Sequence, residues 1–286
     1  MTLLAGLHRN VSEDDYHSDP GERPSLSSSI ANTIIEESPA HAWLEHPKLG
    51  GKANKPTRSM DRGTMLHALL LGGREPHLID ARDYKTKAAQ KERDEAHDAG
   101  ETPMLVGEWA NLQETASLLR AKLATRGVTL AGDSEVTVIW ERDGVLCRGR
   151  IDHLITDGAA VIQDLKFCAS SHPKQVDSRM CDYGYAIQLA AYREAVETIL
   201  PQFTGRVTTQ CVFCEVTPPH CITIAEPDGT MRSLGDMRWN RARRIWKQCL
   251  RTNRWPEYVE GIYRSTAKPW TLEAEMALQY SEEIPI

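Results

Sequence analysis

Two acidic residues and a lysine on neighbouring predicted strands are the side chains best suited to chemistry in this sequence. They lie in Gly149-Arg150-Ile151-Asp152 and in Ile162-Gln163-Asp164-Leu165-Lys166. Carboxylate oxygens are preferred ligands of Mg²⁺, and a nearby lysine can orient a water molecule or offset developing negative charge. The combination therefore suits phosphoryl chemistry, although an isolated D-x-K is also typical of a solvated surface strand.

The predicted strands are joined by Asp157-Gly158, a sequence typical of a hairpin turn. Side chains alternate between the faces of a strand, so Asp152 and Asp164 are expected to converge on one side of the sheet. A tight two-residue loop would set Asp152 opposite Gln163 and turn Asp164 away. The sequence therefore predicts a three-residue loop or a bulge.

Several motifs in a fixed order resemble a known nuclease family. An I-D strand, a D-x-K strand and then Gln188 and Tyr192 on a helix resemble the PD-(D/E)xK nuclease superfamily. Gly63-Thr64-Met65-Leu66-His67, together with the G-R-I-D and Q-D-L-K-F sequences, looks like the RecE-type exonuclease (exonuclease VIII) domain of phages and prophages. The resemblance runs from about Leu26 to Tyr192 and beyond.

The resemblance implies an α/β fold with a PD-(D/E)xK core, a central mixed β-sheet flanked by helices. It implies a metal-dependent exodeoxyribonuclease that degrades linear double-stranded DNA from 5′ to 3′ and leaves 3′ single-stranded overhangs for recombination by strand annealing. A ring-shaped homo-oligomer, with a tetramer favoured over a trimer, and a single-strand-annealing partner protein are also implied. Two alternatives stay open: a catalytically silent DNA-binding or assembly protein, and a Cas4-like or structure-specific nuclease.

The resemblance also assigns metal ligands. Asp152 and Asp164 are expected to bind Mg²⁺, for which Mn²⁺ can substitute, and His67 is expected to complete one coordination shell. The Leu165 carbonyl is a further candidate ligand. Related nucleases place a glutamate near Glu135, which here is weighed evenly against a structural role because its orientation depends on strand register.

The same resemblance assigns catalytic side chains. Lys166 is expected to orient the attacking water and to offset charge on the phosphorane. Gln188 and Tyr192 lie one helical turn apart, on one face of their helix. They are expected to reach the active site or the phosphate backbone.

Composition bounds the class of protein. With 286 residues, 41% hydrophobic and 26% charged, the chain is typical of a globular enzyme. Residues 1–24 are polar and predict an extended arm, and residues 25–286 predict a single domain with a C-terminal basic helix and tail. A net charge of −6 excludes a protein that coats nucleic acid through its overall charge, so contacts with DNA must be local.

Cysteine usage and hydropathy predict a cytoplasmic protein, of bacterial or phage origin. The seven cysteines are an odd number in apolar surroundings, and no apolar run is long enough to span a bilayer. Cys211-x-x-Cys214 resembles half of a zinc site, but zinc sites normally supply four ligands. Buried free thiols are the expected state.

Periodicity predicts the remaining elements. Helices are expected at 30–37, 59–71, 108–126, 183–200 and 237–254, with a short helix that ends near Trp43 and a helix or an ordered loop at 84–100. Strands are expected at 134–141, 145–156, 159–168, 208–215 and 221–226, and a loop at 170–181. The last helix is rich in Arg, and lines a DNA path or forms a solvated face. The tail at 257–286, which holds Trp270, packs on a neighbouring subunit or on the core.

Overall fold

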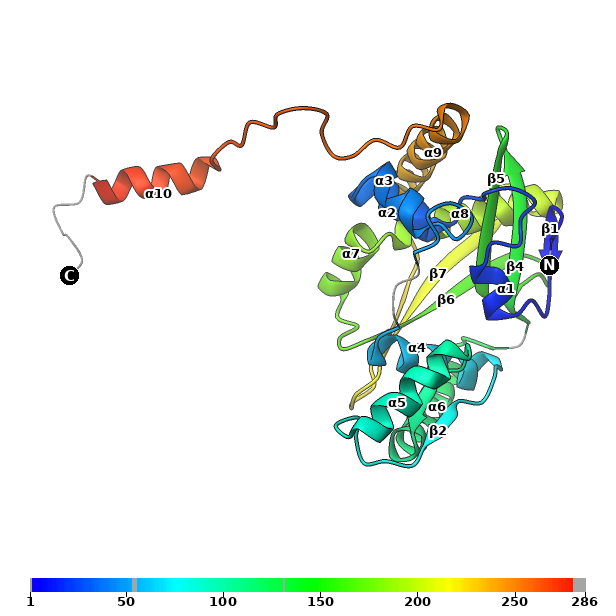
Figure 1. Ribbon diagram of the computed structural model, residues 1–286. Helices are drawn as coiled ribbons and strands as arrows, with labels where there is room; N and C mark the ends of the chain where they lie inside the picture. Colours follow the sequence, from blue (N-terminus) through cyan, green and yellow to red (C-terminus); the bar gives the residue numbers. More distant parts are fainter. Residues whose placement is uncertain (1, 53–55, 131, 280–286) are drawn as a thin grey trace.

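A six-stranded mixed sheet forms the centre of the computed structural model, which describes residues 2–52, 56–130 and 132–279 (Figure 1). Its strands run in the order β1-β4-β5-β6-β7-β8, and all neighbours are antiparallel except β6 and β7. The strands are β1 (Gly6–His8), β4 (Asp133–Arg142), β5 (Val145–Ile155), β6 (Ala160–Cys168), β7 (Val207–Glu215) and β8 (Ile222–Ala225). The predicted mixed sheet flanked by helices is confirmed.

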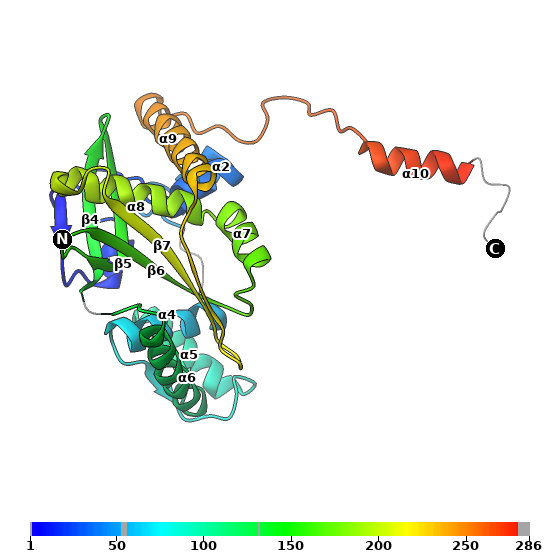
Figure 2. The same cartoon turned by 180° about the vertical axis from the view of Figure 1, so that it is seen from behind.

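Helices cover both faces of this sheet (Figures 1 and 2). On one face α2 (Ser28–Glu36), α8 (Tyr185–Ile199) and α9 (Gly229–Thr252) bury their apolar side chains against β4 and β5 in the largest core cluster. On the other face α4 (Arg58–Leu71) and α6 (Val106–Thr125) pack against β6 and β7. The outer elements are α3 (Pro39–Glu45), α5 (Lys87–Asp98) and the parallel pair β2 (His77–Ile79) and β3 (Pro103–Leu105).

Most predicted elements are present, and the hairpin register is as expected. His153 pairs with Gln163 and Ile155 with Val161, which leaves an odd number of residues in the turn and places Asp152 in register with Asp164. The register that a three-residue loop or a bulge was predicted to give is therefore confirmed, and five residues, 156–160, separate the last paired positions. The apolar stripe predicted for the helix at 108–126 is also buried, at Trp109, Leu112, Ala116, Leu119 and Leu123.

Two predictions about helices were wrong. The segment predicted as a loop at 170–181 contains α7 (Pro173–Asp182), which begins at a proline after a capping side chain, His172. The C-terminal basic helix begins at Gly229 rather than near residue 237, because Asp228 accepts a hydrogen bond from the Met231 amide and caps it there.

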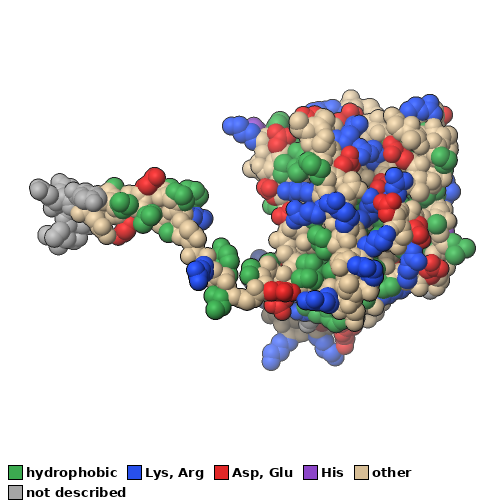
Figure 3. Space-filling view, turned by 90° about the horizontal axis from the view of Figure 1, so that it is seen from above, with side chains coloured by type: hydrophobic (Ala, Val, Ile, Leu, Met, Phe, Trp, Pro, Cys, Tyr) green, Lys and Arg blue, Asp and Glu red, His purple; other side chains and the backbone are tan. Residues whose placement is uncertain are grey.

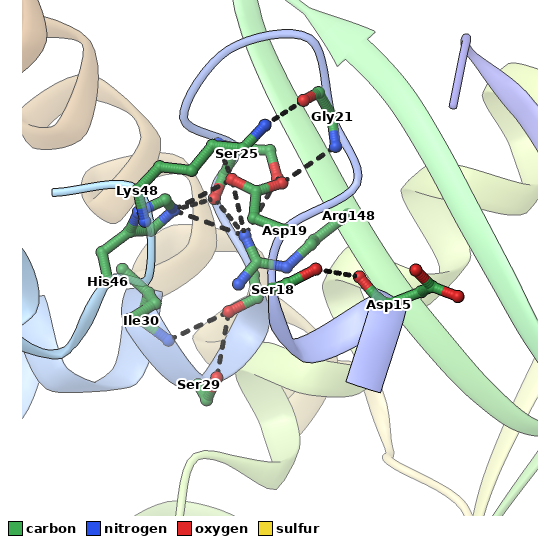
Figure 4. A network of polar contacts seen from close by, with 11 residues as sticks. Asp15, Ser18, Asp19, Gly21, Ser25, Ser29, Ile30, His46, Lys48 and Arg148 are labelled. Carbon is green, nitrogen blue, oxygen red and sulfur yellow. Dashed lines mark hydrogen bonds and ion pairs between the residues drawn. The ribbon is translucent and has the colours of Figure 1, made fainter. Parts of the chain in front are cut away.

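Residues 2–24 lie against the sheet. β1 extends the sheet beside β4, and the short helix α1 (Glu13–His17) follows. A buried polar network fixes the end of this arm, as Figure 4 shows: the Asp19 carboxylate accepts hydrogen bonds from Ser25 and lies 3.3 Å from both Arg148 and His46. These contacts hold the pKa of Asp19 at about 2, against the effect of burial.

The C-terminal segment leaves the body of the protein after α9. Trp255 still packs against Trp246, but α10 (Pro269–Gln279) stands apart and buries none of its residues (Figures 1 and 2). Trp270 is 65% exposed, so in the described residues it does not pack on the core. Residues 280–286 of the predicted tail lie outside the described residues.

Two smaller predictions concern cysteines and membranes. Cys211 and Cys214 are buried free thiols, as expected. Within the described residues, no helix has the length and apolar character needed to cross a bilayer.

Candidate active site

A gap between β5 and β6 creates the candidate site. The two strands pair only where His153–Ile155 meets Val161–Gln163, and beyond that point they diverge while β6 continues beside β7 (Figures 1 and 2). At the start of the gap an Asp152 carboxylate oxygen accepts a hydrogen bond of 2.8 Å from the Leu165 amide. The Asp152 side chain thus accepts, from the β6 backbone, a hydrogen bond of the kind that a β5 carbonyl would accept if the two strands stayed paired.

Three candidate ligands from three different elements converge beside this gap. His67 comes from α4, Glu135 from β4 and Asp152 from β5, and one ligand atom of each lies within 4.8 Å of the others. His67 Nδ1 is 3.6 Å from Asp152 Oδ2. Glu135 has a φ of 53°, an unfavourable backbone conformation for a glutamate that is sustained only by its surroundings.

The remaining predicted acid and the lysine adjoin this cluster. Asp164 has no exposed surface, and one of its oxygens lies 2.5 Å from Lys166 Nζ. Asp164 is not part of the three-residue cluster, but its charge acts on His67 and the charge of Asp152 acts on it. The structure therefore groups His67, Glu135 and Asp152 most tightly and places the Asp164–Lys166 pair next to them.

Burial changes the proton affinity of each group. It raises the pKa of Asp152 to about 7, with a further contribution from the Glu135 charge, although Lys166 opposes the rise. Burial and the Asp152 charge raise the pKa of Asp164 to about 6, again against the effect of Lys166. Burial alone would lower the pKa of Lys166, but the carboxylates of Asp164 and Asp152 outweigh it and raise that pKa. Lys166 is therefore an ammonium at neutral pH.

Gln188 and Tyr192 connect the separated strands. Lys166 Nζ donates to Gln188 Oε1 at 2.9 Å, Gln188 Nε2 donates to the Tyr192 hydroxyl at 3.0 Å, and Tyr192 donates to the Arg150 carbonyl at 2.5 Å. This chain of hydrogen bonds fixes the position of the lysine relative to β5. The two helix residues therefore position Lys166, and the described contacts do not place them at a metal ligand.

The same tyrosine explains the glycine of G-R-I-D. A Cβ atom at Gly149 would lie 2.8 Å from Tyr192 Cε1 and 3.2 Å from a methyl of Val138. Only a glycine lets α8 approach β5 closely enough for the Tyr192 hydroxyl to reach the strand backbone.

The N-terminal arm forms one wall of the cleft that leads to the site. The cleft has a volume of about 660 Å³, and residues 10–14 and 17 line it together with His67, Glu135 and Asp152. Nothing in the local sequence of the arm indicates this position, because it depends on the pairing of β1 with β4 and on contacts with β5.

Arg150 is a residue of the site to which the sequence alone assigned no role. Its guanidinium donates to Glu135 and to the Val11 carbonyl, and it lies 5.9 Å from the centre of the Tyr16 ring. Arg150 and Asp152 lie two residues apart and therefore share one face of β5. This spacing was the feature of the sequence that could have identified Arg150 as part of the site. Arg150 joins the arm to the ligand cluster and neutralises Glu135.

The donor set fits a divalent cation. His67 Nδ1 and Asp164 Oδ1 are buried without a hydrogen-bond partner, an arrangement that is costly unless another group satisfies them. Burial lowers the pKa of His67, so its imidazole is neutral and can act as a ligand. Leu165 has its amide bonded to Asp152 and its side chain packed against α4 and α6, which fixes the backbone at the position where a carbonyl ligand was predicted.

This combination of a split strand pair, acidic ligands and a following D-x-K agrees with a comparison with protein families. The model of a PDDEXK-like domain of unknown function (DUF3799) matches residues 27–265. The chain belongs to this family. The predicted membership of the PD-(D/E)xK superfamily is thereby confirmed, and the matched DUF3799 region excludes both the arm that lines the cleft and α10.

Two solved structures are similar to the chain, and the first of them supports the fold of this PDDEXK-like domain. A crystal structure from Eubacterium rectale, provisionally described as an exonuclease, is 15% identical, with a TM-score of 0.56, and the match covers 93% of this chain and 99% of that chain. A phage related exonuclease from Haemophilus somnus is 16% identical, with a TM-score of 0.35, and the match covers 80% and 96% of the two chains. No curated protein sequence matches the chain.

Proposed function

We propose that the protein is a metal-dependent exodeoxyribonuclease that hydrolyses linear double-stranded DNA. One observation carries the proposal: a half-buried cluster of candidate ligands, His67, Glu135 and Asp152, adjoins the buried Asp164 and its ion-pair partner Lys166. His67 Nδ1 and Asp164 Oδ1 have no hydrogen-bond partner in the described part of the chain. Membership of the PDDEXK-like family and the exonuclease descriptions of similar structures also support a nuclease.

In this proposal the cation is held by His67, Glu135, Asp152 and Asp164, with the Leu165 carbonyl as a further ligand. A bound divalent cation would supply Lewis acidity toward a phosphate oxygen and lower the pKa of a water molecule. Mg²⁺ is the proposed physiological ion, with Mn²⁺ as a substitute, because hard carboxylate oxygens dominate the set.

The protein's own residues supply position and charge. Lys166 keeps its proton at Nζ, since Asp164 and Asp152 raise its pKa, so it offsets negative charge on the phosphorane and orients water rather than accepting a proton. Gln188 and Tyr192 hold that ammonium in place. Catalysis would then rest mainly on placement and electrostatics.

The finer features of the proposal come from the resemblance to RecE-type exonucleases. They are 5′ to 3′ polarity, a 3′ single-stranded product, a ring-shaped homo-oligomer, preferably a tetramer, and a single-strand-annealing partner. Magnesium dependence and a role in recombination belong to the same set of proposals.

The test is degradation of a linear duplex that carries a label at either the 5′ or the 3′ end, in Mg²⁺ or in EDTA. Metal-dependent release of the 5′ label, lost in Asp164→Ala and Lys166→Ala, is the expected result. Release of the 3′ label first would reverse the polarity, and cleavage restricted to branched or single-stranded DNA would identify a structure-specific or Cas4-like nuclease. Binding of DNA without cleavage in either Mg²⁺ or Mn²⁺ would identify a catalytically silent DNA-binding protein.

A further inference from the structure

The outward face of α9 carries a concentration of positive charge that the candidate active site does not use. The helix contains seven Lys and Arg residues and one acid, Asp236, in a chain whose net charge is −6. Arg241, Arg244, Lys247 and Arg251 are exposed and recur at intervals of three or four residues, so they form one stripe, here called the basic stripe. Figure 3 shows Lys and Arg side chains gathered on this face of the molecule.

The basic stripe lies directly opposite the buried face of the same helix. Trp239, Ala242, Trp246 and Cys249 pack into the body, which fixes the rotation of α9 and turns the stripe outward. Within the described part of the chain, the guanidinium groups of Arg241 and Arg244 form no ion pair or hydrogen bond. They are thus not engaged in holding the fold together.

The cleft, by contrast, is acidic. Its lining includes two arginines, Arg74 and Arg150, and six acids: Glu13, Asp14, Glu75, Glu101, Glu135 and Asp152. A polyanion gains little affinity from such a lining until cations bind, so most of the attraction must come from another surface. The basic stripe lies on the side of the sheet covered by α2 and α8, whereas the cleft lies on the side of α4 and the arm.

We propose that the basic stripe is a second nucleic-acid surface, which binds the phosphodiester backbone of DNA outside the cleft. The stripe spans eleven residues, or about 15 Å of helix, a length that corresponds to about nine phosphate charges along duplex DNA. Arginine is suited to this task because its planar guanidinium pairs with phosphate through two hydrogen bonds. The inference rests on the proposed nuclease function, since it assumes DNA as the substrate.

The experiment measures binding of an end-labelled duplex and of a single strand of equal length to the full chain carrying Asp164→Ala, at 50 to 200 mM salt. The test variant adds Arg241→Glu and Arg244→Glu, neither of which removes a contact of the fold. The matched control adds Lys87→Glu and Lys174→Glu, exposed residues on two other helices that give the same change in charge.

Two lost phosphate contacts reduce the slope of log K against log salt by about 1.8. The affinity of the test variant relative to the parent protein should therefore be about tenfold lower at 50 mM salt than at 200 mM salt. We expect that loss in the test variant and not in the control. A loss confined to the duplex identifies the substrate as the ligand, and a loss confined to the single strand identifies the product; either supports the surface. Equal binding by all three proteins, or equal losses in test and control, overturns it.

The nuclease assay separates this inference from the proposed function. With Asp164 restored, the test variant should retain the maximal rate at saturating DNA and show about a tenfold higher KM at low salt. If the wild type does not cleave DNA, the proposed function fails. If the wild type cleaves and the test variant has an unchanged KM, only the inference fails. Arg241→Gln with Arg244→Gln, which should produce a smaller loss, replaces the test variant if thermal unfolding shows that it does not fold.

Discussion

Protons and divalent cations should compete for the same carboxylates. The structure raises the pKa of Asp152 to about 7 and that of Asp164 to about 6, mainly through burial. A carboxylate must lose its proton to bind a metal, so the apparent affinity for Mn²⁺ or Mg²⁺ should rise with pH between 5.5 and 8. His67 adds little to this dependence, because burial already lowers its pKa.

The size of the effect follows from the two pKa values. If both carboxylates must be ionised, protons weaken the affinity by about 130-fold at pH 5.5 and hardly at all at pH 8, so the affinity should increase about 100-fold over this range. At pH 6.5 the two groups together hold about one proton, and each cation should release it. Carboxylates with ordinary pKa values near 4 would give almost no dependence.

The same shifts determine how the metal-free fold responds to pH. A carboxyl whose pKa is higher in the folded state stabilises the fold fully below its unfolded pKa, near 4, and that contribution is lost as the pH rises through 6 and 7. Above pH 7 a bound divalent cation takes over the neutralising role that the proton has at lower pH. Stabilisation by Mn²⁺, measured as an increase in Tm, should therefore grow from pH 5.5 to 8.

Calorimetric titrations with Mn²⁺ in buffers of different ionisation enthalpy measure both the affinity and the protons released. Asp164→Asn should bind more weakly and show a shallower dependence on pH, whereas Asp157→Asn, in the exposed hairpin turn, should behave as the wild type. An affinity that stays constant from pH 5.5 to 8, or binding without proton release at pH 6.5, would refute the assignment of these buried carboxylates as ligands.

Three further predictions concern single residues. Gly149→Ala should lower the free energy of unfolding by about 1–3 kcal/mol, since its Cβ would meet the Tyr192 ring, whereas Gly107→Ala, with no atom near its Cβ, should not destabilise; thermal unfolding measures both. Tyr192→Phe removes the hydrogen bond to the Arg150 carbonyl and should lower kcat about tenfold with a loss of stability of about 1 kcal/mol, so a large loss of stability with unchanged kcat would contradict its positioning role. The pKa of Asp19, whose side chain is buried, is lowered to about 2, so its carboxylate should stabilise the fold by about 2 kcal/mol above pH 4. This stabilisation should be lost as the pH falls toward 2. Asp19→Asn should therefore be less stable at pH 7, and its free energy of unfolding should depend less on pH in acid.

Periodicity and turn chemistry predicted the parts of the fold that depend on local sequence. The apolar stripe of α6 and the register of the β5–β6 hairpin follow from spacing within one element or between neighbours. α7 was missed because only Val176 and Met180 are buried along its ten residues, which gives a weak helical pattern. Its helical state depends instead on packing against α8 and β7.

The candidate site was only partly predictable for a related reason. The acids and the lysine could be found from their strand positions, whereas His67 and Glu135 were candidates only through the family resemblance. His67 approaches Asp152 from α4, nearly ninety residues earlier in the chain, and Glu135 faces the cluster with an uncommon backbone conformation that no propensity favours. The arm contributes through β1, a three-residue edge strand with too short a pattern to recognise.

The pairing of charges explains why the cluster should attract a cation. Arg150 pairs with Glu135, and Lys166 pairs with Asp164, so each basic side chain neutralises one acid. In the described part of the chain, the side chain that lies within 4 Å of the Asp152 carboxylate is the neutral imidazole of His67, which does not neutralise it. Asp152 also has the higher pKa of the two aspartates. The five charged groups therefore sum to −1 when ionised. One divalent cation and one scissile phosphodiester would bring the sum to zero, whereas two cations would leave a buried charge of +2, which is costly. We therefore infer one cation per chain, and the stoichiometry of the Mn²⁺ titration tests this: one site agrees with the charge balance, and two equivalent sites contradict it.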